Sequence, residues 1–208
     1  PLLISSLLKH AEQYHTDTAI ISKNTNGTLV ETNWGNVSQN AKKAAKALAS
    51  LNLFHGDCVA TLAWNNHRHL EAWYGISGSG LICHTINPRL FPEQLIFIIN
   101  DAQDKAIIFD KTFLPLITAI KAHISSVQHF ICLDAHDAEI VKALPEVKFY
   151  DDLIAEQNAN YVWPEFDANT ASSLCYTSGT TGNPKGALYS HRSTVLHSLV
   201  SALPDSLN

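Results

Sequence analysis

The sequence predicts an α/β protein in which helices cover a largely parallel sheet. Along most of the 208 residues, short apolar runs with the character of strands alternate with longer segments whose apolar residues recur every three or four positions. That alternation is typical of βαβ units, whose strands lie parallel in one sheet. The composition, 46% hydrophobic and 16% charged, is ordinary for a globular protein with a packed core.

The first four elements follow from periodicity and from one turn. Leucine and alanine recur on one side of residues 2–14, which predicts a helix. Residues 18–22 and 28–32 are predicted to be short strands, because the turn-forming run 24–27 separates them. Residues 34–51 form the clearest predicted helix of the chain. Its apolar residues at steps of three and four are Trp34, Val37, Ala41, Ala44, Leu48 and Leu51.

From residue 58 onward, predicted strands and helices take turns. Strands are expected where apolar and β-branched residues run together, and helices where the helical period returns, in one case with Pro92 near the first turn. The predicted strands are residues 58–63, 81–86, 106–109, 130–133, 172–176 and 187–189, and the predicted helices are residues 67–77, 92–101, 114–123 and 193–203. Residues 134–164 show no clear period and are expected to form a looser connection.

Charge and hydropathy exclude two kinds of partner. The formal net charge is −5 and no basic run exceeds the pair Lys42 and Lys43, so the chain lacks the positive footprint of a nucleic-acid-binding protein. No apolar run approaches the ~18 residues that a transmembrane helix needs, and the first residues lack the layout of a signal peptide. We therefore expect a cytoplasmic protein without a transmembrane segment.

The residue types that bind metals are scattered along the chain. Cys58, Cys83, Cys132 and Cys175 are far apart and form no C-x-x-C pair, which argues against a zinc site and against a disulfide scaffold. Reduced, buried thiols are expected instead. The eleven histidines include no evident ligand cluster, and lone histidines are more often packed or solvated than bound to a metal.

Three further segments are interpreted as structural. Residues 75–80 contain glycines in an order opposite to that of a dinucleotide-binding fingerprint, so we expect close packing of a helix end against the next strand. Residues 87–89, with the sequence Asn-Pro-Arg, are expected to form a turn. His191 precedes a predicted helix and is expected to have a structural role near its start.

The most informative stretch is Tyr176-Thr-Ser-Gly-Thr-Thr-Gly-Asn-Pro-Lys-Gly186. Glycines let a backbone turn tightly around an anion, exposed N–H groups donate hydrogen bonds, and a lysine adds positive charge, so the composition suits a polyphosphate. The spacing is not that of the Walker P-loop, because Pro184 stands where its second glycine is needed and Gly186 where a Ser or Thr should follow the lysine. The structural alternative is a solvated Gly/Ser/Thr linker.

This stretch resembles the signature of the adenylate-forming superfamily, Tyr/Phe-Thr-Ser-Gly-Ser/Thr-Thr-Gly-x-Pro-Lys-Gly, at every specified position. The superfamily contains acyl-CoA synthetases, luciferases and the adenylation domains of peptide synthetases. Residues 63–75 and 84–94 are similar to the acyl-CoA synthetase branch that acts on fatty acids and on short or medium-chain acids, including methylmercaptopropionate. The resemblance implies that the sheet is part of the large N-terminal, AMP-binding domain of such an enzyme.

The activity that the resemblance implies is AMP-forming acid–thiol ligation with ATP, Mg²⁺ and coenzyme A. In these enzymes the carboxylate of the acid attacks the α-phosphate of ATP, pyrophosphate leaves, and coenzyme A then displaces AMP from the acyl-adenylate. Two anions meet in the first step, so positioned donors and cations lower its barrier.

Individual roles are carried over from the motif. The resemblance implies that residues 177–182 surround the β- and γ-phosphates, that Thr180 is also a Mg²⁺ ligand, and that Lys185 holds phosphate as a mobile point charge. Catalytic roles therefore fall to Thr180 and Lys185. The implied nucleotide-binding residues are Thr177, Ser178, Gly179, Thr180, Thr181, Gly182 and Lys185.

The chain is expected to be part of a longer protein, because it contains no methionine and ends soon after the phosphate loop. We predict a partial AMP-binding domain: residues 1–170 form a first α/β subdomain and a linker, residues 171–208 hold the phosphate loop and the start of the next subdomain, and the C-terminal domain is absent. Homodimers are common in the family. Two other functions stay open: an amino-acid-adenylating domain of a peptide synthetase, and a non-catalytic nucleotide-binding fragment.

Overall fold

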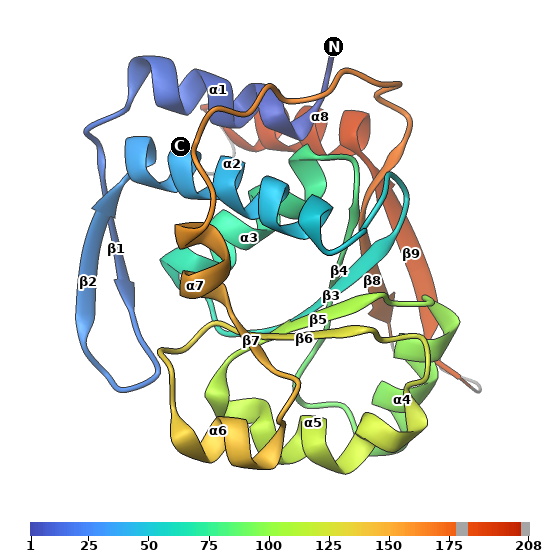
Figure 1. Cartoon of the computed structure of the whole chain (residues 1–208). Helices are drawn as coiled ribbons and strands as arrows, with labels where there is room; N and C mark the ends of the chain where they lie inside the picture. Colours follow the sequence, from blue (N-terminus) through green and yellow to red (C-terminus); the bar gives the residue numbers. More distant parts are fainter. Residues whose placement is uncertain (178–182, 205–208) are drawn as a thin grey trace.

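The computed structural model describes residues 1–177 and 183–204 (Figure 1). The helices are α1 (Ile4–Tyr14), α2 (Trp34–Ser50), α3 (His67–Gly78), α4 (Pro92–Asp101), α5 (Leu114–Ile120), α6 (Ala138–Ala143), α7 (Tyr150–Ala155) and α8 (His191–Ser201), with 3₁₀ turns η1 (Lys111–Phe113) and η2 (Lys121–His123). The strands are β1 (Ala19–Lys23), β2 (Leu29–Asn33), β3 (Cys58–Leu62), β4 (Ile82–Thr85), β5 (Ala106–Phe109), β6 (His129–Cys132), β7 (Lys148–Phe149), β8 (Ala171–Thr177) and β9 (Lys185–Ser190).

Most strands belong to one sheet, whose order is β7-β6-β5-β3-β4-β8-β9. Neighbouring strands from β7 to β8 are parallel, whereas β9 pairs antiparallel with β8. β1 and β2 form a separate antiparallel hairpin. The predicted α/β fold with a largely parallel sheet is therefore confirmed.

Helices cover both faces of this sheet (Figure 1). α1, α2, α3, α7 and α8 lie on one face, and α4, α5 and α6 lie on the other. β5 shows why both faces need cover, because all four of its residues are buried and they alternate between the two cores. Ile107 and Phe109 pack with α4 and α5, while Ala106 and Ile108 pack with α2 and α3.

The prediction of a loose connection over residues 134–164 was wrong. This region contains α6, β7 and α7, and β7 adds a parallel strand at the edge of the sheet. Each of the two helices has six residues and β7 has two, which is too short for a hydrophobic period to be recognised. β9 also begins earlier than predicted, at Lys185, so the lysine of the motif is a strand residue.

The three segments interpreted as structural are structural. Glycines at the end of α3 allow close packing, although their partners are α2 and Trp163 rather than the next strand: a Cβ on Gly75 would lie 2.9 Å from Ala44 Cβ, and one on Gly78 would lie 2.6 Å from the Trp163 ring. Asn87 forms the predicted turn, since its side-chain oxygen accepts from the Arg89 N–H at 3.0 Å.

His191 is fully buried at the first residue of α8. Its Nδ1 accepts from the Ile4 N–H at 3.2 Å, which ties α8 to α1.

All four cysteines are free, and of these Cys83 and Cys132 are buried. None of the helices in the described ranges combines the length and apolar character that a bilayer crossing requires.

Candidate functional site

The hairpin of β8 and β9 brings the two ends of the phosphate motif together. Thr177, the last residue of β8, lies directly opposite Lys185, the first residue of β9. Residues that oppose each other in an antiparallel pair project from the same face, with Cβ atoms roughly 4.5–5.5 Å apart. Both residues are exposed. A threonine and a lysine thus oppose each other where the loop begins and ends.

The rest of the predicted loop lies outside the described residues. This applies to Ser178, Gly179, Thr180, Thr181 and Gly182, and therefore to the proposed Mg²⁺ ligand. Their roles stay predictions. Thr177 and Lys185 are the members of the predicted site whose positions the structure describes.

The Lys185 ammonium group has no carboxylate partner within residues 1–177 and 183–204. Three of the other lysines are ion-paired: Lys42 with Glu12, Lys111 with Asp137, and Lys121 with Glu146. Within the described part of the chain, no carboxylate would therefore have to be displaced before this exposed ammonium group binds an anion.

The other face of the hairpin is anchored by Tyr176. Its hydroxyl donates to Asp101 Oδ2 at 2.6 Å, and its ring centroid lies 5.1 Å from that of His84. Burial, and then the neighbouring Asp101 carboxylate, raise the pKa of Tyr176, so the hydroxyl stays a donor. Beneath it, His84 Nδ1 and Asp104 Oδ2 are 2.7 Å apart and both side chains are fully buried. Burial raises the pKa of Asp104.

Sequence reasoning missed the supporting roles of Asp101, His84 and Asp104. No local pattern could have predicted them, because α4 brings Asp101, and β4 brings His84 with its partner Asp104, to Tyr176 only in the tertiary structure. A second set of contacts holds β8 in place at its other positions. Thr85 Oγ1 and Cys175 Sγ are 3.2 Å apart, and Ser77 Oγ donates to the Ser172 carbonyl at 3.0 Å.

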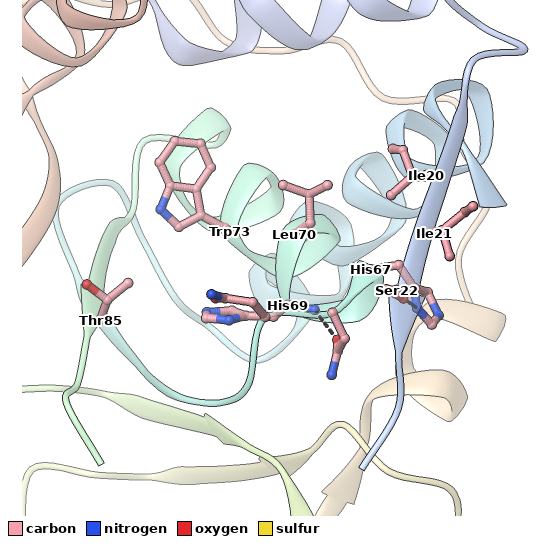
Figure 2. A pocket seen from close by; sticks show the side chains of 10 residues that line it. Ile20, Ile21, Ser22, His67, His69, Leu70, Trp73 and Thr85 are labelled. Carbon is pink, nitrogen blue, oxygen red and sulfur yellow. Dashed lines mark hydrogen bonds between the residues drawn. The ribbon is translucent and has the colours of Figure 1, made fainter. Parts of the chain in front are cut away.

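A pocket of about 450 Å³ lies near the carboxyl ends of β3 and β4. The chain leaves β3, forms α3 on one face of the sheet and enters β4, which neighbours β3. It then forms α4 on the opposite face and enters β5, which neighbours β3 on its other side. Such a reversal of strand order opens a crevice that commonly binds ligands in α/β sheets. Figure 2 shows α3 between β1 and the end of β4. The lining residues are Ile20, Ile21, Ser22, Asn65, Asn66, His67, His69, Leu70, Trp73 and Thr85.

This pocket offers polar groups without positive charge. Burial lowers the pKa of His67 and of His69, so both rings are neutral near pH 7. His67 is already paired with Ser22, Nδ1 to Oγ at 2.9 Å. Since no Lys or Arg is found among the described residues that line it, the pocket suits uncharged groups better than a triphosphate. Of the pocket and the hairpin, the hairpin is the one with a lysine, Lys185, at its end.

No group of three or more His, Cys, Asp or Glu side chains that could hold a metal ion occurs in the described part of the chain. The predicted Mg²⁺ ligand, Thr180, is not among the described residues. We assign no step of the chemistry to the ion.

Comparisons with known proteins show the family and the fold of the chain. The family model described as AMP-binding enzyme matches residues 7–206. A 3-methylmercaptopropionyl-CoA ligase of Ruegeria lacuscaerulensis is 55% identical over 99% of this chain, and a medium-chain-fatty-acid–CoA ligase of Ectopseudomonas oleovorans is 49% identical over 100% of it. A crystal structure of the anthranilate CoA ligase AuaEII in complex with anthranoyl-AMP superposes on 92% of this chain and 36% of that chain, with a TM-score of 0.82 at 25% identity.

The chain spans 38% of the length of both curated relatives. The inhibitor-bound N-terminal domain of FACL13 from Mycobacterium tuberculosis, with a TM-score of 0.77 at 24% identity over 91% of this chain and 44% of that chain, has the same fold. The family match extends over nearly all of the sheet and its helices, the β8–β9 hairpin included. By sequence and by fold, the chain belongs to the AMP-binding enzyme family.

Proposed function

We propose that this chain supplies the phosphate-binding part of an ATP-dependent acyl-CoA ligase. The observation that carries the proposal is the hairpin, which places Lys185, without a carboxylate partner among the described residues, directly opposite Thr177 at the predicted phosphate loop. The relatives support the reaction class, since they are named as CoA ligases for 3-methylmercaptopropionate and for medium-chain fatty acids. The proposed acid is accordingly a fatty acid or a short or medium-chain carboxylate.

In the proposed reaction, a carboxylate oxygen of the acid attacks the α-phosphorus of ATP. The bond from that phosphorus to the bridging oxygen breaks, and its electron pair leaves with pyrophosphate. Lys185 binds the β- and γ-phosphates and stabilises the charge that accumulates on the leaving group. In the second step the coenzyme A sulfur attacks the acyl carbon, the thiol proton passes to solvent, and AMP leaves.

Thr177 and the residues at 178–182 are proposed to donate hydrogen bonds to the same phosphates, and Thr180 to bind Mg²⁺ together with phosphate oxygens. When bound, the ion would supply additional positive charge at the phosphates. The division into a subdomain at residues 1–170 and the beginning of another at 171–208, the homodimer and the cytoplasmic location also remain proposals.

The test is pyrophosphate release by the full-length protein that contains this chain. Acetate, methylmercaptopropionate, octanoate and palmitate are offered in turn with ATP, Mg²⁺ and coenzyme A. We expect release with at least one acid and a matching acyl-CoA product. Absence of release with all four acids, from a folded protein that binds ATP, would favour the non-catalytic alternative. A separate assay offers amino acids in place of these acids, and release with amino acids alone would favour a peptide-synthetase adenylation domain. The 208-residue chain by itself is expected to release none.

A further inference from the structure

We infer that Tyr176 and Gly186 are positioning residues that set where Lys185 stands relative to Thr177. The inference rests on the proposed function of the hairpin. Tyr176 lies opposite Gly186, in the register position next to the pair of Thr177 and Lys185. Because side chains alternate along a strand, the two pairs project from opposite faces of the hairpin. One face carries the phosphate-binding groups, and the other carries the Tyr176 ring.

Gly186 leaves space that the ring occupies. A Cβ atom at this position would lie 3.2 Å from Tyr176 Cζ, 3.4 Å from Tyr176 Cε1 and 3.2 Å from Leu174 Cδ1. Among the described residues, the glycines with positive φ are Gly27, Gly56 and Gly80, and Gly186 is not one of them. The requirement for glycine at position 186 is therefore one of space and not of backbone conformation.

The Tyr176 ring is poorly able to move away from an added methyl group. Its hydroxyl is held by Asp101 at 2.6 Å, and its ring is tilted by 49° against that of His84, which the fully buried Asp104 holds in turn. Leu174 is 6% exposed and packed. An alanine at position 186 would therefore require the Tyr176 ring or β9 to shift by a few tenths of an ångström.

A shift of β9 displaces Lys185, the residue before Gly186. Small errors in the placement of a group that binds the transition state reduce the rate strongly, by up to about a hundredfold for 1 Å. A shift of a few tenths of an ångström at Lys185 is accordingly expected to reduce kcat/KM for ATP by about tenfold. The carboxylic acid does not contact this pair in the proposed reaction, so its KM should change less than twofold.

A double-mutant cycle tests the contact directly. Gly186→Ala, Tyr176→Leu and the double variant are made in the full-length protein, and steady-state constants for ATP and for the acid are measured. Gly186→Ala alone should lower kcat/KM for ATP about tenfold, and it should cost less than twofold when added to Tyr176→Leu, since the ring is then absent. Leu188→Ala, an exposed position on the same strand, is the matched control and should stay within twofold of wild type.

Two results would overturn the inference: an equal loss on Gly186→Ala with and without the ring, or a loss that disappears once the rates are corrected for the fraction of folded protein measured by circular dichroism. Amide hydrogen exchange without substrates gives a readout independent of ligase activity. Gly186→Ala should speed exchange at residues 185–189 and leave β5 unchanged. If the protein proves to be no ligase, unchanged exchange at 185–189 would still refute the contact.

Discussion

Two buried carboxyl groups, Asp104 and Glu71, occupy different parts of this molecule and have different partners. Asp104, at 0% exposure, lies beneath the β8–β9 hairpin, and its Oδ2 is 2.7 Å from His84 Nδ1. Glu71, at 1% exposure, lies in the helical layer on the other face of the sheet. It accepts hydrogen bonds from Asn40 Nδ2 at 3.0 Å and from the Tyr150 hydroxyl at 3.2 Å. An imidazole is the partner in the first case, and two uncharged donors are the partners in the second.

The contacts of Asp104 and those of Glu71 form two networks that reach different parts of the molecule. From Asp104 the contacts pass through His84 to Tyr176, which is one residue from Thr177. From Glu71 they pass through Tyr150 to α7, and they join α2, α3 and α7 into one layer. Burying a carboxyl group is costly wherever it occurs. Here one buried carboxyl group supports the candidate site and the other supports only the packing of helices, so mutations in the two networks should separate function from stability.

The largest effect is expected at the end of the first network. Lys185→Ala should lower the rate of pyrophosphate release by the full-length protein about a hundredfold, the usual loss for one preorganised charge-stabilising donor. Lys185 is exposed, so the melting temperature should stay unchanged. Lys185→Arg should recover only part of the rate, because a planar guanidinium replaces a compact ammonium. Lys9→Ala, on the exposed side of α1, is the matched control. Wild-type rates in Lys185→Ala would remove this residue from the proposed site.

The network around Glu71 should make the free energy of unfolding depend on pH. Burial raises the pKa of Glu71 to about 7, against the effect of its two hydrogen bonds and of Arg68; Asp151 raises it further. The folded protein thus holds a proton that the unfolded chain releases near pH 4.5. This contribution is fully present below that pH and is lost as pH rises through about 7, so the free energy of unfolding should fall by at most about 3 kcal/mol.

Glu71→Gln isolates that contribution. Glutamine has the same shape and does not titrate, so the difference in urea-unfolding free energy between the two proteins should grow from pH 5 to pH 8. Ligase rates at pH 8 should stay within twofold, because this network does not reach the hairpin. A constant difference across the pH range would show that Glu71 does not titrate there.

Asp104→Ala should have a smaller effect on stability but should reach the site. It leaves the buried His84 ring without its partner, which costs about 1–3 kcal/mol. It also loosens the surface against which the Tyr176 ring packs, so KM for ATP should rise by a few fold. Asp104→Asn keeps a hydrogen-bonding group and should restore most of both losses. Loss of stability with KM for ATP unchanged would separate this pair from the hairpin.

The sequence predicted several elements and the pairing at the motif, but not the contacts that form the two networks. The helix at residues 92–101 and the strand at 106–109 were predicted with their observed bounds, because a proline starts the first and a continuous apolar run forms the second. The motif predicted that Thr177 and Lys185 act together, and the hairpin register places them opposite each other. The partners of Tyr176 could not be predicted, since Asp101 and His84 reach it only in the tertiary structure. The motif requires glycine at position 186, but only the structure shows a reason, which is the limited space beside the Tyr176 ring.

The smallest effect is expected at the outer end of the Glu71 network. Arg68 donates two hydrogen bonds to Asp151, at 3.0 Å from Nε and 2.7 Å from Nη2, and the two side chains are 24% and 45% exposed. Asp151→Asn should therefore cost less than about 1 kcal/mol, as is usual for ion pairs that water can reach. That small loss should shrink further in 0.5 M salt, whereas the loss in Asp104→Ala should not, because a buried pair is poorly screened. Urea unfolding of both variants at low and high salt measures this, and equal salt sensitivity would mean that burial does not distinguish the two networks.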